Sequence, residues 1–106
     1  MLQEITIYYK SDKPAKGQDI IKPYGIFVKN NLFNPEVKDE RDNESKLRKI
    51  TYTFSSEQFI PTGADLDDML QEIVEKCNIL NIKRICSNNK YNRKYEVIVK
   101  NEKIEE

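Results

Sequence analysis

The C-terminal third of the chain carries cations and tyrosines at a spacing suited to binding phosphates and bases. Residues 82–87 and 94–100 alternate in the manner of two strands, and the polar residues between them suit a hairpin turn. Cations hold phosphates and aromatic rings stack on bases, so this basic hairpin predicts a site for single-stranded DNA or RNA. The alternative is a solvated hairpin whose lysines deter edge-to-edge aggregation. The candidate nucleic-acid residues are Lys83, Arg84, Lys90, Tyr91, Arg93 and Lys94.

Three carboxylates at the start of an amphipathic stretch form a second candidate. Asp65, Asp67 and Asp68 could hold Mg²⁺ for nuclease chemistry. The same residues also suit the positive end of a helix dipole. We therefore keep a metal site as an alternative and assign no catalytic residue, metal or cofactor to the chain.

The motif Asp65-Leu66-Asp67-Asp68-Met69 opens a predicted helix after a strand and a short loop. This order resembles crossover-junction endonucleases of the RusA family, which carry Asp-x-Asp-Asn before such a helix and have a hairpin after it. The resemblance covers about residues 49–99. Gln71 stands where that family has a lysine, and no further acidic pair occurs between Asn78 and Tyr95. The resemblance therefore implies an inactive, junction-endonuclease-like protein as a further alternative.

Residue types that are missing restrict the chemistry. The chain has no histidine, which excludes Ser-His and Cys-His nucleophiles and histidine proton transfer near neutral pH. Its two cysteines, Cys77 and Cys86, form no CxxC pair and are too few to hold zinc. We therefore expect a protein without enzymatic activity.

Length and charge describe the class of protein. A chain of 106 residues is expected to form a single domain, and 18 basic against 18 acidic residues argue against a protein that coats DNA. No stretch approaches the ~20 apolar residues of a membrane span, and no signal peptide is evident. We expect a cytoplasmic protein without membrane contact. The abundance of Lys, Ile and Asn is common in low-GC bacteria and their phages.

Hydrophobic periodicity predicts the elements that position these residues. Residues 2–10, 24–29 and 49–55 alternate as strands, and residues 62–80 have one apolar helical stripe. We expect mobile loops near 11–23 and 34–48 and a frayed tail at 101–106. The helical stripe comprises Leu66, Met69, Leu70, Ile73, Cys77 and Leu80.

The predicted fold is α+β: a mostly antiparallel sheet of about five strands, in the order β-β-β-α-β-β, with one amphipathic helix packed on one face. One helix covers only one face of the sheet, so the other face is free to bind a partner, unless the two long loops fold over it. The predicted partner-binding face comprises Tyr8, Phe27, Thr51, Thr53 and Ile98.

These patterns favour a small protein-binding module, an accessory or inhibitor protein of a phage or mobile element that docks on a larger host or phage protein. A homodimer is the alternative occupant of the same face. A single-stranded DNA or RNA binder that uses the basic hairpin is the alternative function. The sequence names neither the partner nor the biological process, and it does not fix the strand order.

Overall fold

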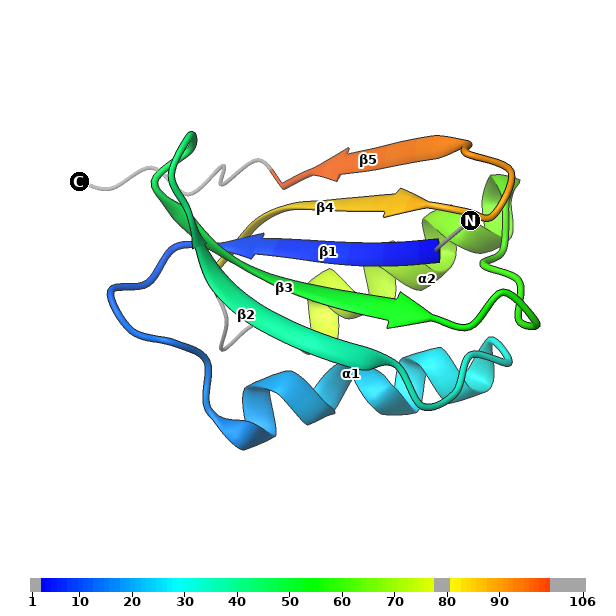
Figure 1. The fold of residues 1–106 in the computed structure, drawn as a ribbon, viewed down its shortest axis with the longest axis horizontal. Coiled ribbons are helices and arrows are strands. Elements are labelled where there is room, and N and C mark those ends of the chain that lie inside the picture. The colour runs from blue at the N-terminus through cyan, green and yellow to red at the C-terminus, as the bar shows by residue number, and fades with distance from the viewer. Residues whose placement is uncertain (1–2, 78–80, 100–106) are drawn as a thin grey trace.

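Helices interrupt the strands twice along the chain (Figure 1). The structure is a computed structural model that describes residues 3–77 and 81–99. Leu80 and the predicted tail lie outside the described residues. The elements are β1 Gln3–Tyr9, α1 Gly17–Lys29, β2 Glu36–Asp42, β3 Leu47–Phe54, α2 Gly63–Lys76, β4 Ile82–Asn88 and β5 Lys94–Ile98.

The strands form one sheet in the order β2-β3-β1-β4-β5, and every neighbouring pair is antiparallel. Strand β1 therefore lies at the centre, between β3 and β4. Each helix connects two parallel strands that have another strand between them, which is the split β-α-β connectivity of ferredoxin-like folds. Strand β5 adds to this arrangement beside β4. Such a fold is shared by many unrelated functions, so it does not assign one.

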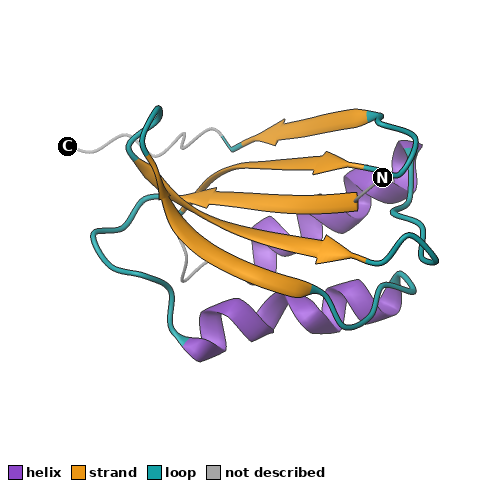
Figure 2. Cartoon of the chain, viewed as in Figure 1, coloured by secondary structure: helices purple, strands orange, loops and turns teal. Residues whose placement is uncertain are grey.

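Both helices pack on the same face of the sheet (Figure 2). The two crossovers run in opposite directions along the sheet, and they start from strands that also point in opposite directions. The usual right-handed sense of each crossover therefore places both helices on one side. The opposite face carries no helix in the part of the chain that the structure describes.

The core lies between the sheet and the two helices. Alternate residues of β1 and β3 point into it, as the sequence predicts, because side chains of a strand alternate between the two faces. Phe27 joins α1 to this layer, with its ring centroid 5.0 Å from that of Tyr52 and 5.1 Å from that of Phe54. Burying a side chain of this size contributes roughly 1.5–3 kcal/mol. The inward hydrophobic residues of the two strands are Ile5, Ile7, Tyr9, Ile50, Tyr52 and Phe54.

Helix α1 corrects two predictions. The predicted loop at 11–23 is helical from Gly17, and the predicted strand at 24–29 is the C-terminal half of the same helix. Phe27 is consequently a core residue with 1% exposure, and its placement on the free sheet face is wrong. Pro23 and Gly25 hid the helix in the sequence, because both residues disfavour helix interiors.

Residues 34–48, predicted to be a mobile loop, instead form β2, a tight turn and the start of β3. Charged residues are common on edge strands, where they oppose pairing with other chains. The Ser45 hydroxyl donates to Asp42 Oδ2 at 2.6 Å in the turn, where Lys46 adopts a positive φ of 64°. The predicted α+β class and antiparallel sheet are confirmed, whereas the element order gains a second helix.

Candidate functional site

The face of the sheet opposite the helices, called the open face below, is lined by polar and charged side chains. Thr6 at its centre lies opposite Thr51 on β3 and Cys86 on β4. Tyr8 lies opposite Lys49 on β3 and Arg84 on β4. The described residues that share this face on the four strands β1, β3, β4 and β5 are Glu4, Thr6, Tyr8, Leu47, Lys49, Thr51, Thr53, Arg84, Cys86, Asn88, Lys94, Glu96 and Ile98.

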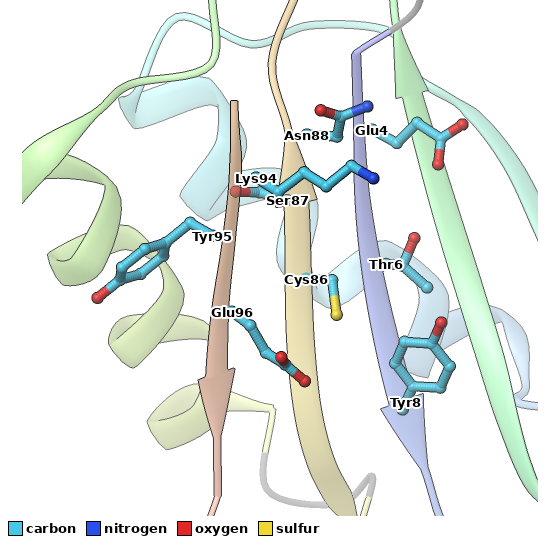
Figure 3. A pocket seen from close by; sticks show the side chains of 9 residues that line it. All are labelled: Glu4, Thr6, Tyr8, Cys86, Ser87, Asn88, Lys94, Tyr95 and Glu96. Carbon is cyan, nitrogen blue, oxygen red and sulfur yellow. The ribbon is translucent and has the colours of Figure 1, made fainter. Parts of the chain in front are cut away.

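A hollow of about 500 Å³ lies on the open face over β1, β4 and β5 (Figure 3). Thr6 and Cys86 lie at its centre, and the Lys94 side chain extends from β5 across β4. Tyr95 points away from the other lining residues, toward α2, where its hydroxyl donates to Asp67 Oδ1 at 2.8 Å. The lining residues are Glu4, Thr6, Tyr8, Cys86, Ser87, Asn88, Lys94, Tyr95 and Glu96.

Charges on the open face are largely paired. The guanidinium of Arg84 lies 4.1 Å from the centroid of the Tyr8 ring, and its Nη1 lies 3.0 Å from Glu96 Oε2. Lys49 lies within 3.8 Å of both Glu40 and Asp42 at the β2 side of the face. The Arg84–Glu96 pair is exposed to solvent and the Lys49 pairs are partly exposed, so solvent screens them and each contributes little to stability. They give the open face a mixed, nearly neutral character.

Cys86 does not behave as an activated thiol. Burial raises the pKa of Cys86, and the nearby Glu96 carboxylate raises it further. A thiol must be deprotonated to act as a nucleophile or a metal ligand, so this environment opposes both roles near neutral pH.

Four of the five residues predicted for partner binding lie on the open face. Tyr8, Thr51 and Thr53 are partly exposed there, and Ile98 is 64% exposed opposite Arg84. Phe27 does not join them, because α1 carries it into the core. Residues 11–23 and 34–48 do not form long loops that could fold over the face, since most of them belong to α1, β2 and β3.

The basic hairpin does not form one continuous patch. Arg84 and Lys94 lie on the open face, and Lys83 lies beside the irregular pairing near Tyr8 and Tyr9. Lys90, Tyr91 and Arg93 lie in the turn between β4 and β5. The structure thus separates the six predicted nucleic-acid residues into two groups and leaves Lys83 apart from both.

Phe59 is a residue that sequence reasoning missed. It lies in the connection between β3 and α2, where its ring centroid is 5.8 Å from that of Tyr91. The adjacent Ile60 is buried with 1% exposure, whereas Phe59 is 42% exposed. Two apolar residues in an extended segment before a helix cannot both point into the core, and this alternation was the available signal.

Asp65, Asp67 and Asp68 do not form a metal site. Successive helix residues are about 100° apart, so Asp67 points to a different side of α2 from the other two. Asp67 accepts the hydrogen bond of Tyr95, whereas Asp65 and Asp68 are exposed. Within residues 3–77 and 81–99, no three acidic, cysteine or histidine side chains are grouped closely enough to hold a metal ion.

No protein-family model matches the chain, and neither a curated protein nor a solved structure is significantly similar to it. The resemblance to crossover-junction endonucleases therefore rests on its one short motif alone. In the described ranges, neither helix has the length and apolar character that crossing a membrane requires.

Proposed function

We propose that the chain is a non-enzymatic protein-binding module, of the accessory or inhibitor kind, that docks on a larger protein through the open face. The observation that supports this proposal most is the placement of both helices on one side of the sheet (Figure 2). Five antiparallel strands thereby present one continuous surface, with Thr6 and Thr51 near its centre.

The chemistry of the open face suits a protein partner better than a small molecule. Small-molecule sites enclose most of their ligand within apolar walls, whereas this hollow lies on the surface of a sheet among charged groups. Threonine hydroxyls can donate and accept hydrogen bonds. The Arg84 guanidinium, stacked on the Tyr8 ring, adds hydrogen-bond donors beside an aromatic surface. Arg and Tyr are enriched at protein interfaces. Alternating charges around the centre orient a partner more than they add affinity.

A variant in the middle of the open face tests the proposal. Thr51→Arg places a long charged side chain on the solvent side of β3 and leaves the core unchanged. Gln71→Arg makes a similar change on the exposed side of α2 and serves as the matched control. We expect a partner captured from a lysate of the source organism to bind the wild type and Gln71→Arg alike. With that partner purified, Thr51→Arg should weaken binding at least about 10-fold, which corresponds to about 1.4 kcal/mol.

Equal binding by Thr51→Arg and the wild type would exclude the open face as the docking surface. Light scattering on the purified chain covers the remaining alternative. A dimer that Thr51→Arg dissociates and Gln71→Arg leaves intact would identify a second copy of the chain as the occupant.

A further inference from the structure

The end of the sheet where β3 and β4 terminate carries an exposed pair of aromatic rings. Phe59 comes from the connection between β3 and α2, and Tyr91 comes from the turn between β4 and β5; both segments lie at the same end of the sheet (Figure 1). Their ring centroids are 5.8 Å apart at an interplanar angle of 58°. Tyr91 is 67% exposed, so most of its ring is accessible to a ligand.

A hollow of about 480 Å³ adjoins these rings and is called the turn hollow below. Its lining combines two aromatic rings with one guanidinium and two small polar side chains. This volume lies in the range of sites that hold small organic ligands, roughly 300–1,000 Å³. The lining residues are Phe59, Thr62, Asn89, Tyr91 and Arg93.

The side chain of Asn89 fixes the geometry of the turn. Asn89 is 3% exposed, and its Oδ1 accepts hydrogen bonds from the backbone N–H groups of Tyr91 at 2.9 Å and Arg93 at 3.1 Å. The Asn89 N–H donates to the Arg93 carbonyl at 3.1 Å, and Asn92 takes the positive φ of 61° that closes the turn. The backbone at Tyr91 and Arg93 is therefore held in place before any ligand binds, which reduces the entropic cost of ordering the turn on binding.

Cations accompany the rings. The ammonium of Lys90 lies 5.7 Å from the Phe59 centroid and 5.9 Å from the Tyr91 centroid, and it donates to the Ser56 carbonyl at 3.2 Å. Among the described residues, neither Lys90 nor Arg93 forms an ion pair. Within the part of the chain that the structure describes, no acidic residue lines the turn hollow; Glu57 and Asp65 line a separate hollow shared with Phe59.

We propose that the turn hollow binds a nucleotide unit of single-stranded nucleic acid. A base stacks on the exposed face of Tyr91 beside Phe59, and the adjoining phosphate lies against Arg93 and Lys90. Aromatic rings can stack on any base, so they add affinity without selecting a sequence. Cations without an ion-pair partner attract the phosphate. This inference concerns a different surface from the open face and does not depend on the proposed protein partner.

Fluorescence anisotropy with a labelled strand of about ten thymidines tests the inference at about 50 mM salt. The wild type should bind, and its affinity should fall as salt rises. Tyr91→Ala should weaken binding about 5- to 150-fold, because stacking on the ring is lost, whereas Tyr91→Phe keeps the ring and should bind like the wild type. Tyr91 is exposed, so neither change should disturb the fold.

Charge reversal provides the second arm of the experiment. Arg93→Glu should weaken binding and make the salt dependence less steep, since fewer phosphate contacts remain. Lys13→Glu is the matched control, because it makes the same charge change on an exposed residue in the connection between β1 and α1, at the opposite end of the sheet. Its affinity should stay within about twofold of the wild type, as expected for a distant exposed charge.

Competition identifies the source of the nucleotide. Displacement of the strand by thymidine monophosphate would assign the turn hollow to free nucleotides as well, and failure to displace it would restrict the site to strands. The proposal is overturned if the strand does not bind, if Tyr91→Ala binds like the wild type, or if Arg93→Glu and Lys13→Glu have equal effects. Competition by polyglutamate as strong as that by unlabelled strand would also overturn it, because polyglutamate has charge without bases.

Discussion

The hydroxyl of Tyr9 links three separate segments of the chain inside the protein. It donates to the Asp39 carboxylate on β2, 2.9 Å away, and accepts the N–H of Ala15, 3.0 Å away, from the connection before α1. Asp39 also accepts the Ala15 N–H at 2.8 Å and lies 3.4 Å from the Arg48 guanidinium. Burial raises the pKa of Tyr9, so the hydroxyl keeps its proton and its role as a donor. Buried polar groups need such partners, because burying them without any is costly.

Removing this hydroxyl should therefore destabilise the protein. Tyr9→Phe leaves the ring in the core but removes one donor from Asp39 and one acceptor from Ala15, and we expect a loss of about 1–2 kcal/mol in the free energy of unfolding. Urea unfolding measures it. Tyr95→Phe makes the same chemical change at the exposed hydrogen bond to Asp67 and should leave the urea midpoint nearly unchanged. Equal midpoint shifts in the two variants would mean that burial of the Tyr9 hydroxyl is unimportant.

The residues of the core were more predictable than their polar partners. Tyr9 could be placed inward from its alternation with Ile5 and Ile7. The inward orientation of Asp39 could not be predicted. A carboxylate in a highly charged stretch is expected to face solvent, unless the Tyr9 hydroxyl, distant in the sequence, is known to lie opposite it. The sequence proposes Tyr91 and Arg93 as nucleic-acid ligands, which stays a prediction, and their juxtaposition with Phe59 depends on two connections that meet only in the folded chain.

Helix α1 forms although two residues in its interior, Pro23 and Gly25, are poor helix formers. Pro23 lacks the N–H that would donate to the previous turn, and Gly25 is flexible in the unfolded chain. Tertiary packing compensates for both, since Pro23, Ile26 and Phe27 are buried against the sheet and α2. Helices in proteins depend more on the packing of their apolar face than on intrinsic propensity.

Glycine substitutions should distinguish propensity from strain. An alanine Cβ at Gly25 would contact no other group within 4 Å, so Gly25→Ala should raise the free energy of unfolding by about 0.5–1 kcal/mol. Gly63 at the start of α2 has equally open surroundings but a φ of +63°, so Gly63→Ala should lower it by about 1–2 kcal/mol. Thermal unfolding followed by circular dichroism measures both variants. A destabilised Gly25→Ala would contradict the helical conformation at that residue.

Helix α2 was predictable because its apolar stripe runs without a breaker from Leu66 to Ile73. Strand β2 was not predictable, because Val37 is its one apolar residue and all its other residues are charged. The sheet recruits β2 through its hairpin with β3, so its conformation depends on a neighbour more than on its own sequence. The strand order was also beyond the sequence, since the connections are long enough to allow several orders.

At the scale of the whole molecule, the fold divides the chain into a covered side and an open side, and burial on the covered side favours the neutral forms of Tyr52 and Cys77. Burial raises the pKa of the Tyr52 hydroxyl, which donates to the Ile20 carbonyl at 2.7 Å. Burial also raises the pKa of the Cys77 thiol on the core side of α2.

Stability should consequently fall at alkaline pH. The usual pKa values are 9.0 for a cysteine and 10.0 for a tyrosine, and the unfolded chain loses these protons there while the folded protein retains them. The contribution of these groups to the free energy of unfolding is therefore fully present below about pH 9. It declines as pH rises, by up to about 1.4 kcal/mol per pH unit for each retained proton. Urea midpoints from about pH 7 to about pH 10.5, with a reductant present, should show the decline. Cys77→Ala should flatten its first part, and a midpoint independent of pH would refute the expectation.

The central position of β1 has a consequence for biosynthesis. A ribosome releases β1 before either of its neighbours, and those neighbours, β3 and β4, end only at Phe54 and Asn88. While translation continues, the apolar row of Ile5 and Ile7 has no sheet to join, and both edges of the strand are free to pair with other nascent chains. A chaperone that shelters β1 would shorten this exposure, and synthesis of β4 would release the strand into its place.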